Sequence, residues 1–395
     1  MTLQSGKNVQ VALKRQSGLG VPASGASAIG LNVNPGQGLK LTKAIINSNA
    51  IRKDGQMKRG RHGSRSGDCA YAIELGVGML DDIIEAAMRG TWVATATITQ
   101  AAMTSATTTT NTIVAAAGSW LTQGIRRGDM IKLASFADAA NNGKWFRVVA
   151  VSASTITVPA ASLVLNATPD TTFSVVVAKT LVNGATPVER YYTMEEFGLD
   201  ISKGLLGTDF KVCKLELSIQ PDANIVMTAT FKGLDVAEQD TSPNFTSPVY
   251  STSLPLVMVD GIIRVNGVDY SVLTGFTLTW DMGGSTTPTL SKTSPDVNLS
   301  NAKVSGSFTA LLGDMVFFAA FRAETQVDFF IVMSENEADP ADFIAAYVGN
   351  AVLDGADAPI GDDGAMPVTV PWRAGIDEGG SDRALTTVKW ASSAA

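Results

Sequence analysis

Cysteine and long apolar runs are both scarce in this 395-residue chain. Cys69 and Cys213 are the only cysteines, and two isolated cysteines make neither a disulfide framework nor a metal-binding spacing. We therefore expect both to be small buried apolar residues. No segment reaches the roughly 18 consecutive apolar residues of a membrane-spanning helix, and the N-terminus lacks a charged-then-apolar signal pattern. The sequence therefore predicts no membrane segment and synthesis in a cytoplasm.

Residues suited to catalysis are also few. His62 is the only histidine, and it stands near Ser64 and Asp68 in a glycine-rich segment, which is a poor support for a catalytic triad. Some acidic residues near the C-terminal end lack the spacing and central glycine of a calcium loop; they are Asp354, Asp357, Asp362 and Asp363. No zinc motif, phosphate loop or nucleophile elbow is present. These absences favour a structural protein with no metal or cofactor over an enzyme.

The charge of the chain is divided unevenly between its two ends. Up to Gly67 there are eleven Lys and Arg residues and a single acid, Asp54, which gives this stretch a net charge of +10. Because the whole chain carries -7, the remainder carries -17. The opposite charges of these two parts favour a contact between the basic N-terminal stretch of one copy and the acidic remainder of another. The basic stretch lacks the interleaved aromatic residues of a nucleic-acid stacking surface.

One sequence pattern occurs twice. Residues 81–89 read DDIIEAAMR and residues 314–322 read DMVFFAAFR, and each follows a strand-like segment. The apolar residues of the first copy fall on one stripe of a helix, its two acids favour the first turn, and Gly90 favours a stop. A repeated supersecondary unit has to bury its copies against each other or against further copies. The pattern therefore indicates a ring, tube or array.

The remaining periodicities predict a chain made mostly of strands. Alternating or β-branched segments predict strands over residues 39–51, 69–77, 128–133, 145–151, 155–158, 172–177, 210–219, 225–232, 256–265, 272–281, 304–310 and 327–333. Helices are expected over 79–89 and 314–322. Polar, glycine-rich segments predict loops over 52–67 and 283–299. We also match 39–49 with 272–281, and 228–233 with 369–374, as further parts of the repeat.

These matches predict a mainly β fold with a duplicated unit and an insertion. We expect an N-terminal arm over 1–38, a first unit over 39–92 and 181–240, an inserted small all-β module over 93–180, a linker over 241–252 and a second unit over 253–395. A loop tolerates an insertion of this size because the cost of loop closure grows slowly with length.

Several motifs together carry a resemblance to a known family. They are Gly20–Gly25 in the arm, Gly36–Leu39 before the first strand, the basic 52–67 loop, the helix ending in Ala86–Trp92, and the pair Val268–Phe276 and Val304–Ala310. In these features the chain resembles the tail tube, or major tail, protein of bacteriophages with long non-contractile tails (siphophages). The resemblance covers most of the chain through loose patterns.

The resemblance implies a specific architecture and function. Tail tube proteins are β-sandwich domains with a flanking helix, whose sheets join between subunits into a closed barrel ring. Rings stack into the hollow virion tail around a tape-measure protein, between tail terminator and distal tail proteins, and DNA passes through an acidic lumen during ejection. Simple members carry one domain and form homohexamers. A duplicated domain implies homotrimeric, pseudo-hexameric rings.

The resemblance also gives a role to the basic loop. In the family this hairpin loop reaches toward the next ring, so the resemblance implies an inter-ring contact for Arg52, Lys53, Lys58, Arg59, Arg61, His62 and Arg65. A competing hypothesis is a virion decoration protein or adhesin, whose inserted module binds host glycan through Trp120, Trp145 and Phe146. Packing of these aromatic residues in a core is the other interpretation of them.

Overall fold

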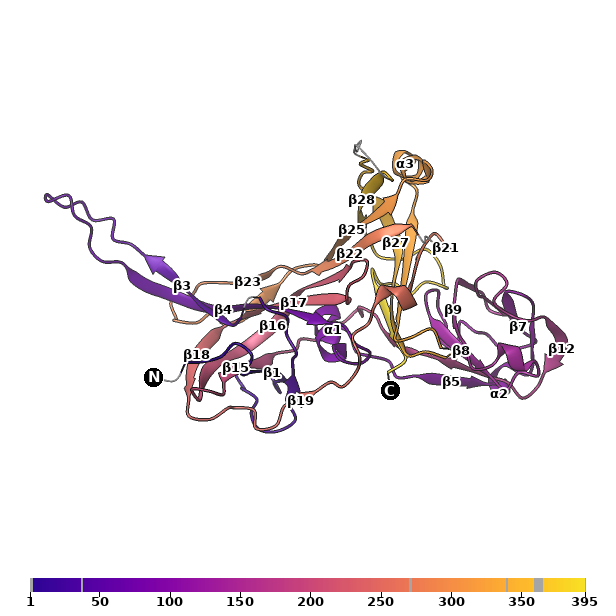
Figure 1. Cartoon of the computed structure of the whole chain (residues 1–395), viewed down its shortest axis with the longest axis horizontal. Helices are drawn as coiled ribbons and strands as arrows, with labels where there is room; N and C mark the ends of the chain where they lie inside the picture. Colours follow the sequence, from indigo (N-terminus) through magenta and orange to yellow (C-terminus); the bar gives the residue numbers. More distant parts are fainter. Residues whose placement is uncertain (1–2, 37, 270–271, 339, 359–364, 395) are drawn as a thin grey trace.

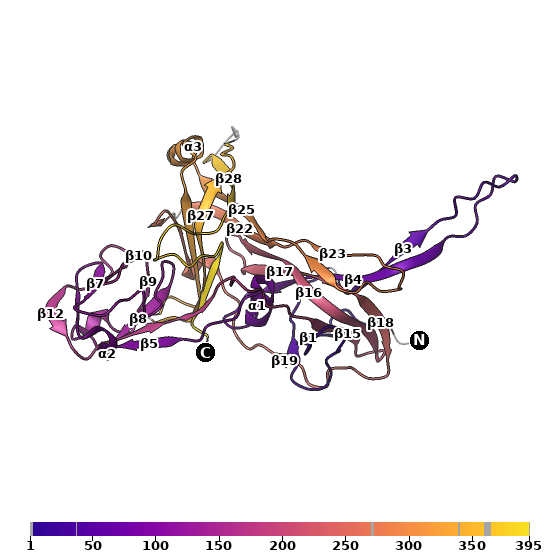
Figure 2. The ribbon, with the colours of Figure 1, turned by 180° about the vertical axis from the view of Figure 1, so that it is seen from behind.

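The computed structural model describes residues 3–36, 38–269, 272–338, 340–358 and 365–394. Strands dominate, and the described residues hold three α-helices, which confirms the mainly β class predicted from the sequence. The chain is elongated: a long hairpin projects at one end and a separate small β module occupies the other (Figure 1). The same arrangement is seen from behind (Figure 2). Asp362 and Asp363 lie outside the described residues.

One antiparallel sheet runs through the middle of the molecule. Its strands follow one another in the order β3, β4, β17, β16, β22, β25, β28 and β27. They are β3 (Lys40–Ile46), β4 (Arg61–Glu74), β17 (Val226–Gly233), β16 (Lys203–Ile219), β22 (Leu273–Asp281), β25 (Lys303–Leu311), β28 (Pro367–Ala374) and β27 (Phe343–Leu353). Alternation fixes the faces: in β17, Met227, Ala229 and Phe231 are buried while Thr228 and Thr230 are half-exposed on the other side. We call this assembly the long sheet.

Two shorter sheets branch from the long sheet. One contains β1 (Val9–Arg15), β15 (Tyr192–Gly198), the first part of β16 and β18 (Asp235–Asp240); the other contains β20 (Ile262–Val265), β26 (Val327–Ser334), the first part of β27 and β29 (Lys389–Ser392). β16 changes sheets at a bulge, where Asp209 has a φ of 57° and accepts a hydrogen bond from the Gly20 amide. Phe210, Phe231, Phe276 and many other apolar side chains make one core between these layers.

The C-terminal strands repeat the pairings of the N-terminal strands. β1 pairs with β15, β3 with β4, β4 with β17, β17 with β16, and β16 with both β15 and β18. In the same order, β20 pairs with β26, β22 with β25, β25 with β28, β28 with β27, and β27 with both β26 and β29. A bulge follows the Tyr192–Phe210 pair in one set and the Val327–Ala351 pair in the other. The same order of strand pairings, with a bulge at the same place, therefore occurs twice.

Each set of strands carries a helix at the same point. α1 (Asp81–Met88) follows β4, and α3 (Val316–Arg322) follows β25, which confirms both predicted helices. Arg89 lies just beyond α1 in the left-handed conformation, with a φ of 50°. Asp314 also lies outside its helix, and its carboxylate accepts a hydrogen bond from the Val316 amide. The third helix, α2 (Gln100–Met103), is a single turn elsewhere.

Residues between α1 and β15 include a small β module with its own core. One sheet contains β10 (Ala150–Val151), β11 (Thr155–Thr157), β7 (Thr112–Ala115), β6 (Ala106–Thr108) and β12 (Asn166–Asp170); the other contains β5 (Ala96–Thr99), β13 (Ser174–Val177), β8 (Met130–Ala134) and β9 (Trp145–Arg147). The module enters and leaves through adjacent strands, because Val93 and Thr180 exchange two backbone hydrogen bonds. Such close ends are what an insertion into a host loop requires.

The module is bound firmly to β26, β27 and β29. Asp129 forms an ion pair with Lys389, and both residues are buried. The Trp145 ring packs edge-on against Phe343 with centroids 5.1 Å apart, and Arg147 stacks over Phe330 at 4.9 Å. We call this contact the module seam. The module is therefore packed on its host.

Several sequence-based boundaries need correction. Residues 61–67, predicted as loop, belong to β4, and residues 9–15 of the predicted arm form β1 inside a sheet. The predicted 283–299 loop contains the hairpin β23 (Gly284–Thr286) and β24 (Val297–Leu299), and the predicted linker contains β19 (Val249–Tyr250), which pairs with β2 (Ile29–Gly30). The predicted 256–265 strand begins at Ile262, after the 3-10 turn η2 (Met258–Asp260). β14 (Lys179–Leu181), β21 (Val268–Asp269) and η1 (Ala139–Asn141) complete the described elements.

Candidate assembly surfaces

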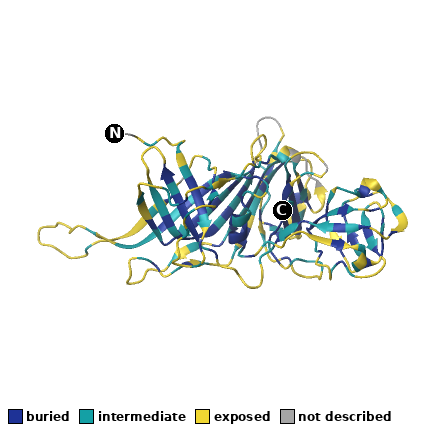
Figure 3. Cartoon of the chain, turned by 90° about the horizontal axis from the view of Figure 1, so that it is seen from below, coloured by how far each residue is buried: buried dark blue, intermediate teal, exposed yellow. Residues whose placement is uncertain are grey.

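The β3–β4 hairpin extends far beyond the rest of the chain (Figure 1). Its base is held by cross-strand pairs such as Lys43 with Arg65 and Ile46 with Arg61. Its tip, residues 47–60, carries apolar side chains that face solvent: Ile51 is fully exposed and Met57 is 73% exposed. Most of the tip is exposed (Figure 3), with only Ser48 and Gly60 partly covered. Exposed apolar residues on a projecting tip are typical of surfaces that bind partners.

The basic residues of the predicted contact divide between tip and base. Arg52, Lys53, Lys58 and Arg59 lie on the tip, whereas Arg61, His62 and Arg65 lie on β4. Two of these residues have acidic partners within the chain, since Arg52 pairs with Asp54 and Arg65 with Asp235. The structure therefore brings the seven residues onto one hairpin but in two settings. Their role in an inter-ring contact stays a prediction.

β3 is an edge strand of the long sheet. Among described residues its ladder partner is β4 alone, so its other edge presents unpaired backbone groups. Lys40 is exposed on this strand, and a groove of about 580 Å³ beside it is lined by residues of β3, β4 and β17. A long unpaired edge without a covering element is a template for pairing with another strand. No sequence motif predicted this free edge, because it follows only from the order of the strands in the sheet.

Among the described residues, one face of the long sheet has no second sheet over it, and only the β23–β24 hairpin packs on it, beside Cys213 and Lys232. Small hydroxyl residues dominate that face, including Thr228, Thr230, Thr277, Thr279, Ser305 and Ser307. Its charged residues are mixed in sign: Asp68, Glu74, Glu216, Asp281 and Asp357 stand with Lys40, Lys214, Lys232, Lys303 and Arg373. Two ion pairs cross or follow the strands, Asp68 with Lys232 and Glu216 with Lys214. We call this surface the open face.

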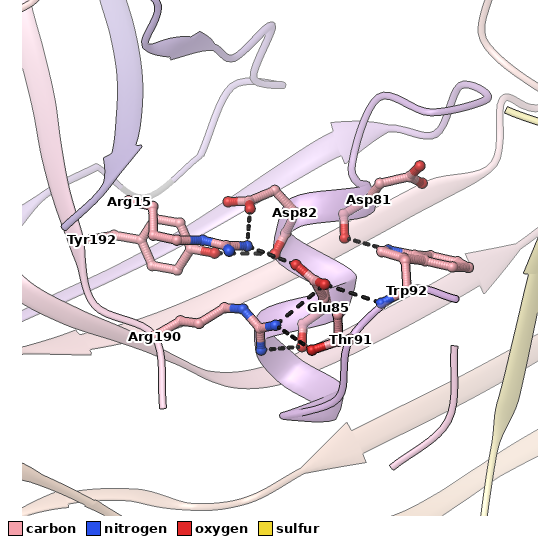
Figure 4. Close-up of polar contacts among 8 residues, drawn as sticks. All are labelled: Arg15, Asp81, Asp82, Glu85, Thr91, Trp92, Arg190 and Tyr192. Atoms are coloured by element: carbon pink, nitrogen blue, oxygen red, sulfur yellow. Dashed lines mark hydrogen bonds and ion pairs between the residues drawn. The ribbon is translucent and has the colours of Figure 1, made fainter. Parts of the chain in front are cut away.

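A buried ionic network fixes α1 (Figure 4). The Glu85 carboxylate lies 2.7 Å from Arg15 on β1 and 3.2 Å from Arg190 ahead of β15, and it accepts a 3.0 Å hydrogen bond from the Trp92 amide. The Tyr192 hydroxyl donates to the Asp82 carbonyl at 3.0 Å. The Glu85 side chain thus ties the helix to two segments that are distant in sequence and to the residues that follow the helix.

Among the described residues, the matching helix α3 is less covered. At corresponding positions of the repeated motif, Ile83 and Met88 of α1 are each 1% exposed, whereas Val316 and Phe321 of α3 are 48% and 41% exposed. Phe318, where α1 has Glu85, packs against the core. The same motif is therefore buried in one copy and half-open in the other, so α3 presents apolar side chains to solvent.

The residues weighed for other chemistry have structural roles. His62 is exposed on β4, and Asp68 bonds Thr42 and Lys232, so these residues do not form a triad. Trp120 and Phe146 are buried in the module core and Trp145 lies in the module seam, so the structure does not support a glycan surface made by all three. Both cysteines are buried and free, as predicted. Among described residues there is no cluster of metal-ligand type and no helix long and apolar enough to cross a membrane.

The geometry defines a class of protein: a mainly β chain whose exposed features are a sheet edge, a projecting hairpin and a hydroxyl-rich sheet face. Comparison with protein families matches residues 6–374 to the family described as phage tail tube protein. The chain therefore belongs to the phage tail tube protein family, which is a family of structural proteins of the virion tail. A search of curated proteins finds no match.

Proposed function

We propose that this chain is the subunit of a hollow tail tube, built by joining its long sheet to those of other copies. The observation that supports this most is the free edge of β3 on a sheet whose other strands are already paired side by side. A sheet closed through subunit contacts has no exposed edges, and this favours rings over open aggregates.

Three chains make one ring in this proposal. The two sets of equivalent pairings act as two tube domains, with the boundaries predicted from the sequence: arm 1–38, first domain 39–92 and 181–240, module 93–180, linker 241–252 and second domain 253–395. Three chains then supply six domains with pseudo-sixfold symmetry. Rings of six chains are the alternative. The module lies at the end of the molecule opposite to the hairpin (Figure 2). In the proposed ring it projects outward.

The hairpin tips stack one ring on the next. Their charge complements the acidic remainder of the chain, and their exposed Ile51 and Met57 provide apolar contact area. The predicted contact set of Arg52, Lys53, Lys58, Arg59, Arg61, His62 and Arg65 then acts chiefly through its four tip residues.

The open face lines the channel around the tape-measure protein and later the DNA, within a virion tail that ends in terminator and distal tail proteins. Its hydroxyls and balanced charges differ from the acidic lumen expected from the family resemblance. A neutral lining presents no net cationic surface to the phosphate backbone. It therefore still avoids the tight DNA binding that counterion release drives on cationic surfaces. DNA passes through during ejection without specific binding.

Electron microscopy and ring mass measurement test this proposal. Purified chain should form rings of three copies that stack into tubes, and a chain that stays monomeric at high concentration would refute it. Arg59→Glu with Arg61→Glu should leave rings intact and shorten tubes. The matched control is Lys132→Glu with Lys144→Glu on the module, which makes the same charge change away from the hairpin. Unchanged tube length in the variant with Arg59→Glu and Arg61→Glu would refute the stacking role.

A further inference from the structure

The chain contains one junction of the kind that a ring needs. In the long sheet the first set supplies β3, β4, β17 and β16, and the second set supplies β22, β25, β28 and β27. β16 pairs with β22 through six residue pairs from Lys214–Asp281 to Ile219–Phe276. Within it, Glu216 stands opposite Thr279, and Leu215 opposite Trp280. Leu215 and Trp280 are buried, so this junction is a continuous part of the core.

The strand ladders show which residues are equivalent in the two sets. One row crosses β16, β17, β4 and β3 as Lys211, Lys232, Asp68 and Lys40. The matching row crosses β27, β28, β25 and β22 as Val352, Arg373, Ser305 and Thr279. Lys40 therefore occupies on the free edge the position that Thr279 occupies inside the chain.

The counterpart of the β16 side of this junction lies at the edge of the long sheet opposite to β3. Residues 354–358 continue β27, and Asp357 bridges to Thr369 as Glu216 pairs with Thr228. Asp357 is therefore the counterpart of Glu216. Asp357 is exposed, whereas Ala356 and Ala358 pack against the core, so this segment already has strand-like alternation. It borders β28 on one side, and among the described residues no strand pairs with its other side.

We infer that β3 of one copy pairs antiparallel with residues 354–358 of a second copy, in the register of the β16–β22 junction. Lys40 then stands opposite Asp357 and Leu41 opposite Ala356. The pairing places a cation against an anion where the internal junction has a threonine against a glutamate, and charge complementarity across strands favours this register over its neighbours. The inference rests on the proposed tube function and names the surface that closes the ring.

Cysteine cross-linking tests the register. In Leu41→Cys with Ala356→Cys the two thiols are cross-strand neighbours, so mild oxidation of assembled rings should give covalently closed oligomers on non-reducing gels. The control is Leu41→Cys with Val352→Cys, which shifts the register by four residues, or about 13 Å along the strand. It should give roughly tenfold less product, because a disulfide needs Cα atoms within about 7 Å. The native Cys69 and Cys213 are buried and leave the background low.

A charge swap gives an independent readout. Lys40→Asp or Asp357→Lys alone should impair ring closure, since each places like charges opposite each other, and the two changes together should restore it. Equal cross-linking in the matched and shifted pairs, or failure of the swap to rescue, would overturn the register while leaving a ring-forming protein. Absence of rings from the wild-type chain would instead overturn the proposed function itself.

Discussion

The module seam contains a buried ion pair whose disruption has a predictable size. Asp129 and Lys389 have side chains only 2% and 4% exposed, so solvent screens their attraction very little. Asp129→Asn keeps the acceptor for the Arg126 amide but leaves the Lys389 ammonium buried without a counter-charge. Removal of one partner from a buried pair costs about 3–5 kcal/mol. We therefore expect the seam to open far more often in this variant.

Hydrogen exchange of β29 measures that opening. The amides of Lys389–Ser392 are protected by pairing with β27 and β14, so they report local separation at the seam. The expected cost corresponds to exchange faster by on the order of a hundred- to several thousand-fold. The control is Asp129→Asn with Lys389→Met, in which neither charge remains and most of the protection should return. Wild-type protection in the single variant, or equal loss in the double variant, would refute the electrostatic reasoning.

Three further predictions follow from other contacts. Glu85→Ala leaves the buried Arg190 guanidinium without its counter-charge, so it should lower the free energy of unfolding by about 3 kcal/mol; an unchanged urea midpoint would contradict this. Burial raises the pKa of the Cys213 thiol to about 12 and that of Cys69 well above its usual range, so both thiols should resist alkylation at pH 8 until the chain unfolds, and full labelling of native protein would count against their burial. Deletion of residues 94–178 should expose the apolar host side of the module seam and cause aggregation unless Phe330 and Phe343 are made polar, after which tubes should form. A plain deletion that stays soluble would show that the seam packs weakly.

Local patterns predicted the elements that alternate or show helical periodicity. α1 was found because one stripe of it is apolar, and α3 because it repeats the α1 motif. β17, β22 and β25 were found because they bury every second residue. β27 was missed because Phe343–Leu353 is apolar on almost every residue, as expected of a strand covered on both sides. The base of the hairpin was missed for the opposite reason, because residues 61–67 are polar and glycine-rich and are strand only through pairing with β3.

The candidate surfaces were less accessible to sequence reasoning. The basic hairpin residues were visible as a charge cluster, yet the unpaired edge of β3 and the role of residues 354–358 depend on the order of strands in space. The same holds for Glu85, whose partners Arg15 and Arg190 lie far from it in the chain. Pairing order and long-range ion pairs have no local signature in a single sequence.

The internal β16–β22 junction has a kinetic consequence for the proposed ring. A contact between two parts of one polypeptide forms at the effective concentration set by the connecting chain, whatever the amount of protein in the cell. Half of the six sheet junctions in a three-chain ring would therefore be complete as soon as each chain folds. Only the three junctions between chains would depend on the concentration of subunits. Fusion of two domains lowers the molecular order of assembly, which favours closed rings early in infection, when subunits are still scarce.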